Sequence, residues 1–316
     1  MTLARFVVRR AAGGVLFALV VASLTLLLAR LAPGDVDIEM KPEELAARRA
    51  EMGLDQPLLA QYGHWLSGLA RFDLGRSTKY NRPVADMIGE RALNTALLAT
   101  VALAVASLLG IPLGRFTGAS QGPLARAVKA ASIVVLSVPP LLSALLLVFV
   151  AAETGWFPVG GMTSGGLTGA AWLADLAWHL PVPVLALALP LAATLERVQA
   201  RAMAEAIGQP FVDASRARGL TRERTLRVHA WPASLAPVFG IYGVLVGALF
   251  SGSFVVEMVA SWPGLGRLLF DALYARDVWL VAGCGAAGAA SLAVGTTVAD
   301  VLHAVLDPRV LERRRA

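Results

Sequence analysis

Residues 93–113 read LNTALLATVALAVASLLGIPL, and this stretch decides the class of fold. It has no charged side chain over a length that, as a helix, crosses roughly 30 Å of hydrocarbon. Five further apolar stretches have the same character, although residues 181–194 are short and rich in proline. The six predicted spans are residues 11–29, 93–113, 130–152, 181–194, 235–256 and 278–305. The sequence therefore predicts an all-α, polytopic membrane protein with six transmembrane helices.

The composition agrees with a chain that lies mostly out of water. Apolar residues make up 57% of the 316 positions and charged residues only 16%, and the mean hydropathy is +0.65. A soluble domain carries about 25% charged residues. The net charge of +6 could suggest a nucleic-acid partner, but the basic residues punctuate the apolar runs instead of forming one basic face. We therefore expect membrane lipid around the chain and no nucleic acid.

Cysteine and histidine give no sign of a metal or catalytic site. The single cysteine, Cys284, lies in an apolar stretch among small residues, so neither an internal disulfide nor a Cys-based metal site can form. The histidines are scattered without metal-ligand spacing. They are His64, His179, His229 and His303. Ser164 lies in an outer loop with no histidine partner inside a span, which gives a Ser-type hydrolase little support. We predict no metal and no catalytic residue.

The distribution of Lys and Arg predicts the orientation of the spans. Seventeen of the 28 lie before the first span, between spans two and three, between spans four and five, or after span six. The positive-inside rule then places both termini in the cytoplasm. The first span is longer than a signal-peptide core, and no small-residue cleavage site follows it, so we expect it to be retained.

The predicted segments are 1–30, the N-terminal segment with the first helix; 31–91, an extracytoplasmic loop or small subdomain; 92–306, the core with five helices; and 307–316, the cytoplasmic tail. Two short amphipathic helices are expected in the outer loop, over Pro42–Met52 and Pro57–Leu69. They could form a lid on the helix ends or a docking surface for an external partner, and both interpretations stay open.

The polar segment between spans four and five, residues 203–232, reads MAEAIGQPFVDASRARGLTRERTLRVHAWP. Its small residues Ala214, Ser215 and Ala217 would let a short helix approach another surface closely. Gly219 is predicted to end that helix as its C′ residue, and Thr221 to cap a second one. The pattern favours a helix–turn–helix outside the membrane, shaped to enter a groove on a partner.

This segment resembles the coupling loop of binding-protein-dependent ABC importers, whose pattern is approximately E-A-A-x3-G-x9-I-x-L-P. Asp213 takes the place of the glutamate, Gly219 that of the glycine and Pro232 that of the proline. His229 and Trp231 are departures, since they stand where the family pattern has isoleucine and leucine.

The run SRARGL at 215–220 is similar to the dipeptide, oligopeptide and nickel branch of that family. Landmarks along nearly the whole chain agree in order and spacing. They are Arg9-Arg10, Pro33-Gly34-Asp35, Met52–Pro57, Asp73-Leu74-Gly75, Arg82-Pro83-Val84, Glu257 with Trp262, Pro263, Gly264 and Gly266, and Asp307-Pro308-Arg309. The compact outer loop is slightly more similar to the nickel-type permeases.

The resemblance implies a bacterial inner-membrane permease subunit for peptides, nickel or nickel chelates. Its implied partners are a second, homologous permease, two cytoplasmic ATPases and an extracytoplasmic substrate-binding protein. The chain lacks a G-x4-GK[ST] phosphate loop, so it is not expected to be an enzyme, and ATP and Mg would be bound by the ATPases. The residues implied to meet an ATPase are Glu205, Gly208, Phe211, Asp213, Ala214, Ser215, Arg216, Ala217, Arg218, Gly219 and Leu220. Among them Asp213, Arg216 and Arg218 are candidates for interfacial charge pairs.

Three alternatives remain at this stage. An ion-coupled secondary transporter would use carboxylates at span centres and often inverted repeats, and neither is evident. Glu257, at the outer end of the fifth span, could hydrogen-bond to the turn at 260–266 or contact substrate. Pro139-Pro140 in the third span could open backbone groups toward a pathway or produce a plain kink.

Overall fold

The computed structural model describes residues 3–31, 55–69, 71 and 73–306. These residues are almost entirely helical, and within them no β-strand forms, apart from a single antiparallel bridge between Arg76 and Pro83. They divide into two compact units. Unit 1 contains the described residues of Met1–Arg9, Leu97–Trp262 and Gly295–Ala316, and unit 2 those of Arg10–Ala96 and Pro263–Val294. The all-α class is confirmed.

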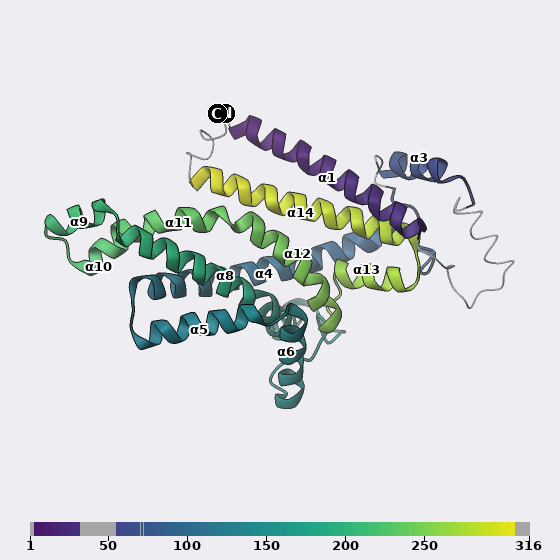
Figure 1. Ribbon diagram of the computed structural model, residues 1–316. Helices are drawn as coiled ribbons and strands as arrows, with labels where there is room; N and C mark the ends of the chain where they lie inside the picture. The colour runs from purple at the N-terminus through teal and green to yellow at the C-terminus, as the bar shows by residue number, and fades with distance from the viewer. Residues whose placement is uncertain (1–2, 32–54, 70, 72, 307–316) are drawn as a thin grey trace. The chain divides into compact units, whose positions relative to one another are not determined.

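Figure 1 shows the helices in chain order. They are α1 (Leu3–Leu31), α3 (Leu58–Leu69), α4 (Val84–Ala119), α5 (Pro123–Ser137), α6 (Pro140–Thr154), α7 (Gly169–His179), α8 (Pro181–Ile207), α9 (Pro210–Ala217), α10 (Arg222–Thr225), a π-helical turn (Leu226–Ala230), α11 (Trp231–Gly240), α12 (Tyr242–Val259), α13 (Leu265–Tyr274) and α14 (Val278–Leu306). The predicted amphipathic helix over 57–69 is confirmed as α3. The one predicted over 42–52 lies outside the described residues.

Five helices are long and apolar enough to cross a membrane: α1, α4, α8, α12 and α14. A sixth span exists if α5 and α6, which meet at a bend of 105°, are counted as one. The polytopic class is thus confirmed, but the third span is not the straight helix predicted over 130–152. Val138 is extended before the Pro139-Pro140 pair, because proline disfavours helical geometry in the residue before it. The break is therefore much sharper than a kink.

Two further spans differ from the prediction. The fourth does not stop at Thr194, because α8 continues as one helix to Ile207. The fifth, predicted over 235–256, is divided at Ile241 into α11 and α12. A π-helical turn precedes α11. In this turn the Trp231 N–H donates to the carbonyl of Leu226, five residues earlier. Pro232 follows without an N–H group, so the regular hydrogen-bond ladder cannot continue through this point.

Unit 1 is built around α8, which packs against α5, α6, α11 and α12. Its core contains leucine and alanine side chains of α4 and α8 together with Leu245, Leu249 and Trp262. Three glycines of α4, spaced four residues apart, face α8 so closely that a Cβ atom at any of them would collide. These are Gly110 against Ala192 and Leu195, Gly114 against Glu196 and Gln199, and Gly118 against Ala200 and Met203. The two helices therefore meet backbone to backbone along this stretch.

Unit 2 packs α3, the N-terminal part of α4, α13 and the start of α14 around a core that includes Trp65, Ile88 and Trp279. Asp277 is fully buried and accepts hydrogen bonds from the hydroxyl of Ser77 at 2.6 Å and from the N–H groups of Lys79 and Leu280, both at 3.1 Å. This carboxylate thus caps α14 and ties the segment that precedes α4 to it.

Candidate functional site

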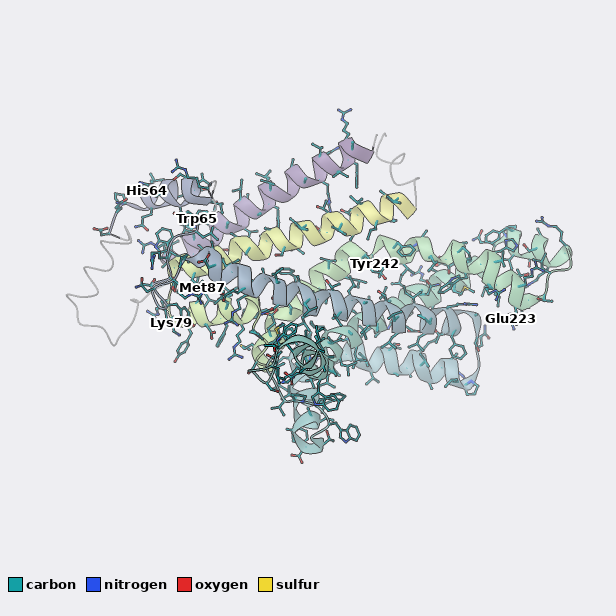
Figure 2. The ribbon with its side chains drawn as sticks, turned by 180° about the vertical axis from the view of Figure 1, so that it is seen from behind. His64, Trp65, Lys79, Met87, Glu223 and Tyr242 are labelled. Carbon is teal, nitrogen blue, oxygen red and sulfur yellow. The ribbon has the colours of Figure 1, made fainter. Side chains whose placement is uncertain are left out.

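The segment predicted to meet a partner, residues 203–232, forms the end of α8, α9, α10 and the π-helical turn. Figure 1 shows α9 and α10 at the far end of the α8–α11 pair, and Figure 2 labels Glu223 of α10 there. Helix α9 begins with proline in its first turn and has Asp213 in the first turn and Arg216 in the last. Both charges favour the helix through its dipole.

The end of α9 confirms the role predicted for Gly219. Its φ of +85° is left-handed, and its N–H donates to the carbonyl of Arg216 at 2.8 Å. The next N–H, from Leu220, donates to the carbonyl of Ser215 at 3.3 Å. These two bonds form a Schellman motif, which needs glycine at the left-handed position. The cap predicted at Thr221 is also confirmed, since its hydroxyl oxygen accepts from the Arg224 N–H at 3.4 Å.

Helix α9 has one face that packs against the rest of unit 1 and one face that is exposed. Val212 is fully buried with Met203, Ala206 and Ala230. Ser215 is also buried and donates its hydroxyl to the carbonyl of Phe211. That bond stays within α9, and its burial places Ser215 on the face that packs against the rest of unit 1. The exposed face carries Phe211, Asp213, Ala214, Arg216, Ala217 and Arg218.

The charged residues predicted for interfacial pairs are held only loosely within the chain. Arg216 lies 3.7 Å from Asp213 in an exposed contact, and the Arg218 Nε donates to the carbonyl of Ala214 at 3.3 Å. Glu205 pairs with Arg201 at 2.9 Å on the exposed side of α8. Exposed ion pairs contribute at most about 1 kcal/mol, so these groups can exchange partners at little cost.

Gly208 ends α8 without a left-handed φ, and a side chain there would meet only ordinary contacts. Conformation therefore does not require glycine at this position.

A buried polar cluster joins α4, α8 and α11 next to this segment. It consists of Thr117, Glu196, Gln199 and Ser234 and is called the Glu196 cluster. Thr117 of α4 donates its hydroxyl to the Glu196 carboxylate, and the Gln199 amide donates to Ser234 of α11 at 2.7 Å. Glu196 and Gln199 are almost completely buried. Within the described part of the chain, one oxygen of each, Oε2 of Glu196 and Oε1 of Gln199, makes no hydrogen bond.

Sequence reasoning missed the Glu196 cluster because Glu196 seemed to mark the end of the fourth span. One signal was available in the sequence. Glu196 and Gln199 are three residues apart and so lie on one face of a helix, and the glycines of α4, four residues apart, also share one face.

Two further contacts join α4 to the polar segment. The guanidinium of Arg115 lies 4.9 Å from the ring centroid of Trp231, which is a cation–π geometry. Arg222 donates to the carbonyl of Ala119, the last residue of α4, at 3.2 Å. The polar segment therefore contacts α4 as well as the two helices between which it lies in the sequence.

The turn that follows α12 contains the second set of predicted residues. Glu257 and Trp262 are fully buried in unit 1, and the Trp262 N–H donates to the backbone carbonyl of Glu257 at 2.9 Å. The bond predicted from the Glu257 side chain stays a prediction.

In unit 2, the Pro263 carbonyl accepts from the Asn94 amide at 2.8 Å, and α13 begins just after Gly264, with Gly266 in its first turn. The remaining signature residues, 33–35 and 307–309, lie outside the described residues.

The serine considered for hydrolysis has a structural role. Ser164 donates both its N–H and its hydroxyl to Asp175, at 2.6 and 2.8 Å. The Nδ1 atom of His179 lies 2.8 Å from the backbone carbonyl oxygen of Asp175 and not at the serine. Because the serine hydroxyl is directed at the carboxylate, no Ser–His relay forms. The bond from the Ser164 N–H is the main cause that lowers the pKa of Asp175 below its usual value. No three His, Cys, Asp or Glu side chains group as a metal site within the described ranges.

Residues 110–312 match the family of binding-protein-dependent transport system inner membrane components, and residues 3–99 match the N-terminal family of the same membrane components. The chain is a member of this permease family. The permease is therefore a multi-pass inner-membrane protein and a transport component, as the sequence predicted.

Named relatives cover nearly all of the permease. The oligopeptide transport system permease protein AppB of Bacillus subtilis is 30% identical over 98% of this chain and 99% of its own length. A putative peptide transport system permease protein of Brucella abortus is 35% identical over 96% of this chain and 98% of its own. The oligopeptide transport system permease protein OppB of Mycobacterium tuberculosis is 33% identical over 84% of each chain.

Proposed function

We propose that the permease forms one half of the translocation pathway of an ATP-driven importer for peptides. It pairs with a second, homologous permease, receives cargo from an extracytoplasmic binding protein and contacts two cytoplasmic ATPases, which bind ATP and Mg. Peptides are favoured as cargo because these relatives, which match most or nearly all of the chain, carry peptide or oligopeptide in their names. Nickel or a nickel chelate, which the resemblance also allows, is the competing cargo.

The two-faced construction of α9 is the observation that carries this proposal. Its inner face, with buried Val212 and Ser215, packs the helix against α8 and the π-helical turn. Its outer face presents Phe211 as an apolar anchor, flanked by small alanines and by arginines whose partners can exchange. An aromatic anchor with arginine beside it is the composition that dominates protein interfaces.

The contacts behind α9 provide a route for force. Only Gly208 and Gln209 separate α9 from α8, so the two helices cannot move far independently. The Arg222 bond to the end of α4 and the glycine contacts between α4 and α8 bring α4 into the same body. Closure of the ATPases on ATP would then tilt α4, α8 and α11 together and switch the pathway between inward- and outward-facing states.

The orientation follows from the charge pattern. The positive-inside rule puts the 203–232 segment and both termini on the cytoplasmic side, where ATPases would be. A cysteine introduced at exposed Ala214, in a protein with Cys284 replaced by alanine, should react with a membrane-impermeant maleimide only in inverted vesicles.

The proposal is tested with Phe211→Ala and Ala214→Trp in the assembled importer. Either substitution should lower co-purification of the ATPases about tenfold or more, because interface anchors contribute about 2 kcal/mol or more. Substrate-stimulated ATP hydrolysis in proteoliposomes should fall with it. Trp156→Ala, an exposed aromatic in the loop after α6, is the matched control and should change neither.

Equal ATPase recovery from the Phe211 and Ala214 variants and the native protein would refute the coupling role. Peptide uptake that persists without the ATPases and follows an ion gradient would indicate a secondary transporter instead.

A further inference from the structure

Unit 2 contains an apolar cavity of about 290 Å³ between α1 and α3. Its walls include Leu24, Leu27 and Arg30 of α1 and Leu59 and Tyr62 of α3. It is larger than an engineered protein cavity of about 150 Å³ that holds benzene. Figure 1 shows α3 beside the C-terminal end of α1, and Figure 2 labels its residues His64 and Trp65.

The cavity has fixed walls. The hydroxyl groups of Ser23 and Tyr62 lie 2.9 Å apart and tie the two helices together. Ser23 already donates to the carbonyl of Leu19 at 2.7 Å, so the tyrosine is the donor in the pair. Tyr62 stacks on Trp65, which is buried in the core of unit 2. Both hydroxyl groups have partners, and the amide of Gln61, the other uncharged polar residue of the lining, donates to the carbonyl of Gln56 at 2.6 Å.

The exposed leucines of the lining form one apolar patch, which favours an apolar covering over water. Leu59 is 86% exposed, and Leu24 and Leu27 are also exposed. Helix α1 is a membrane span with very little of its surface buried by the described chain. Tyr62, which is partly exposed, is the kind of aromatic residue expected where a membrane meets water.

Charge decides which lipid would fit. Arg30 is the only charged residue that lines the cavity among the described residues, and it lies in the last turn of α1. From the last turn of a span, the arginine stem can follow the apolar wall while its charged end extends away from the apolar part of the helix. A guanidinium has five N–H donors in a planar fork that matches a phosphate, so a bond within the chain leaves donors for a ligand.

We propose that this cavity holds an acyl chain of an anionic phospholipid whose phosphate is bound by Arg30. The lipid fills the space between α1 and α3 and covers Leu24, Leu27 and Leu59. It belongs to the leaflet in which α1 ends. This site is independent of ATPase coupling and of the cargo.

The test uses the full-length protein in nanodiscs of phosphatidylcholine with a minor fraction of phosphatidylglycerol. One of the two lipids at a time carries a photoreactive group in its acyl chain, and labelled peptides are identified by mass spectrometry. We expect label on α1 near Leu27 and on α3, with phosphatidylglycerol preferred. Arg30→Gln should reduce that preference about tenfold, the value of one good charge-assisted contact. Leu27→Trp should fill the cavity and remove labelling by both lipids.

Matched controls lie elsewhere on α1. Leu16→Trp changes a leucine that is 63% exposed and does not line the cavity, and Arg9→Gln removes a basic residue near the other end of the helix. Both should label as the native protein does. Each variant must elute as a single species, which separates loss of the site from misfolding.

Two results would overturn the proposal. One is equal labelling of Leu27→Trp and Leu16→Trp. The other is a phosphatidylglycerol preference that survives Arg30→Gln. Absence of label on α3 in the native protein would show that protein fills the cavity, either residues 32–54 or a partner subunit, and would also refute it.

Discussion

Replacing Gly114 by alanine should destabilise the permease, although alanine is the better helix former. A Cβ atom at this position would lie 2.5 Å from the backbone oxygen of Glu196 and 2.6 Å from the Cβ of Gln199. To reach an ordinary contact, α4 and α8 would have to separate by roughly 0.9 Å, and a gap of that size forfeits up to about half of each dispersion contact.

The magnitude follows from two opposing effects. Overpacking a close contact costs about 1–3 kcal/mol, while replacing glycine by alanine inside a helix returns up to about 1 kcal/mol. With the full helical gain, the net loss for Gly114→Ala is up to about 2 kcal/mol. Gly89 lies in the same helix with nothing near its Cβ position, so Gly89→Ala receives only the helical gain. The two substitutions should therefore shift stability in opposite directions.

The assay is the midpoint of thermal unfolding of the purified full-length protein in one detergent, followed as the fraction that remains monodisperse after heating. We expect the midpoint to fall for Gly114→Ala and to hold or rise for Gly89→Ala. Gly110→Ala and Gly118→Ala should behave like Gly114→Ala. If Gly114→Ala raised the midpoint as much as Gly89→Ala, α4 and α8 would not be in backbone contact, and the proposed route for force through α4 would fail.

Three other substitutions test local features. Thr117→Val should destabilise the protein by about 1–3 kcal/mol or more in chemical unfolding, because it leaves the buried Glu196 carboxylate without its donor. Gly219→Ala should cost about 1–2 kcal/mol of α9 stability, since alanine tolerates a left-handed φ poorly, and should lower ATPase recovery without lowering membrane insertion. Asp175→Asn should lower the thermal midpoint at neutral pH. The Ser164 N–H bond lowers the pKa of Asp175 below 3.8. The ionised carboxylate therefore contributes fully to the stability of the folded protein above pH 3.8. This contribution is lost as the pH falls below that value, where the two proteins should have the same stability.

The first two substitutions have a control variant on the same element, and the third is checked by its pH dependence. Thr100→Val changes an exposed threonine of α4 and should be nearly neutral. Gly219→Asn should recover most of the loss, because asparagine tolerates the left-handed region. A constant difference between Asp175→Asn and the native protein at all pH values would contradict the ionic origin of the Ser164 bond.

The sequence predicted most of the fold because apolar length is a local property. Lipid satisfies no backbone group, so a stretch such as 93–113 must be helical wherever it lies in the chain. The cap at Thr221 and the left-handed Gly219 were equally predictable, since each depends on neighbours a few residues away. The bend at Pro139-Pro140 was visible as a break, but its angle of 105° depends on what α5 and α6 pack against.

The sequence predicted where the candidate site lies in the chain, but not which face of α9 is exposed. The pattern of 203–232 indicated a helix and a turn, yet it ranked Ser215 with Ala214 and Ala217 as outward small residues. The structure buries Ser215, because the face of α9 that packs on unit 1 is chosen by Val212 and its neighbours Met203 and Ala230. The periodicity of the sequence predicts that the helix has two faces. Only the packing decides which of them is exposed.

By itself, the sequence determined that this chain lies in a membrane, the approximate positions of its apolar stretches and polar segment, and which family it resembles. These follow from hydropathy, charge placement and short motifs, all of which act over a few residues. The tertiary structure alone decided that α4 touches α8 through three glycines, that Glu196 is buried against Thr117, and that α1 and α3 line an open apolar pocket beside Arg30. Each joins residues far apart in the chain, and such contacts depend on how helices pack rather than on any local pattern.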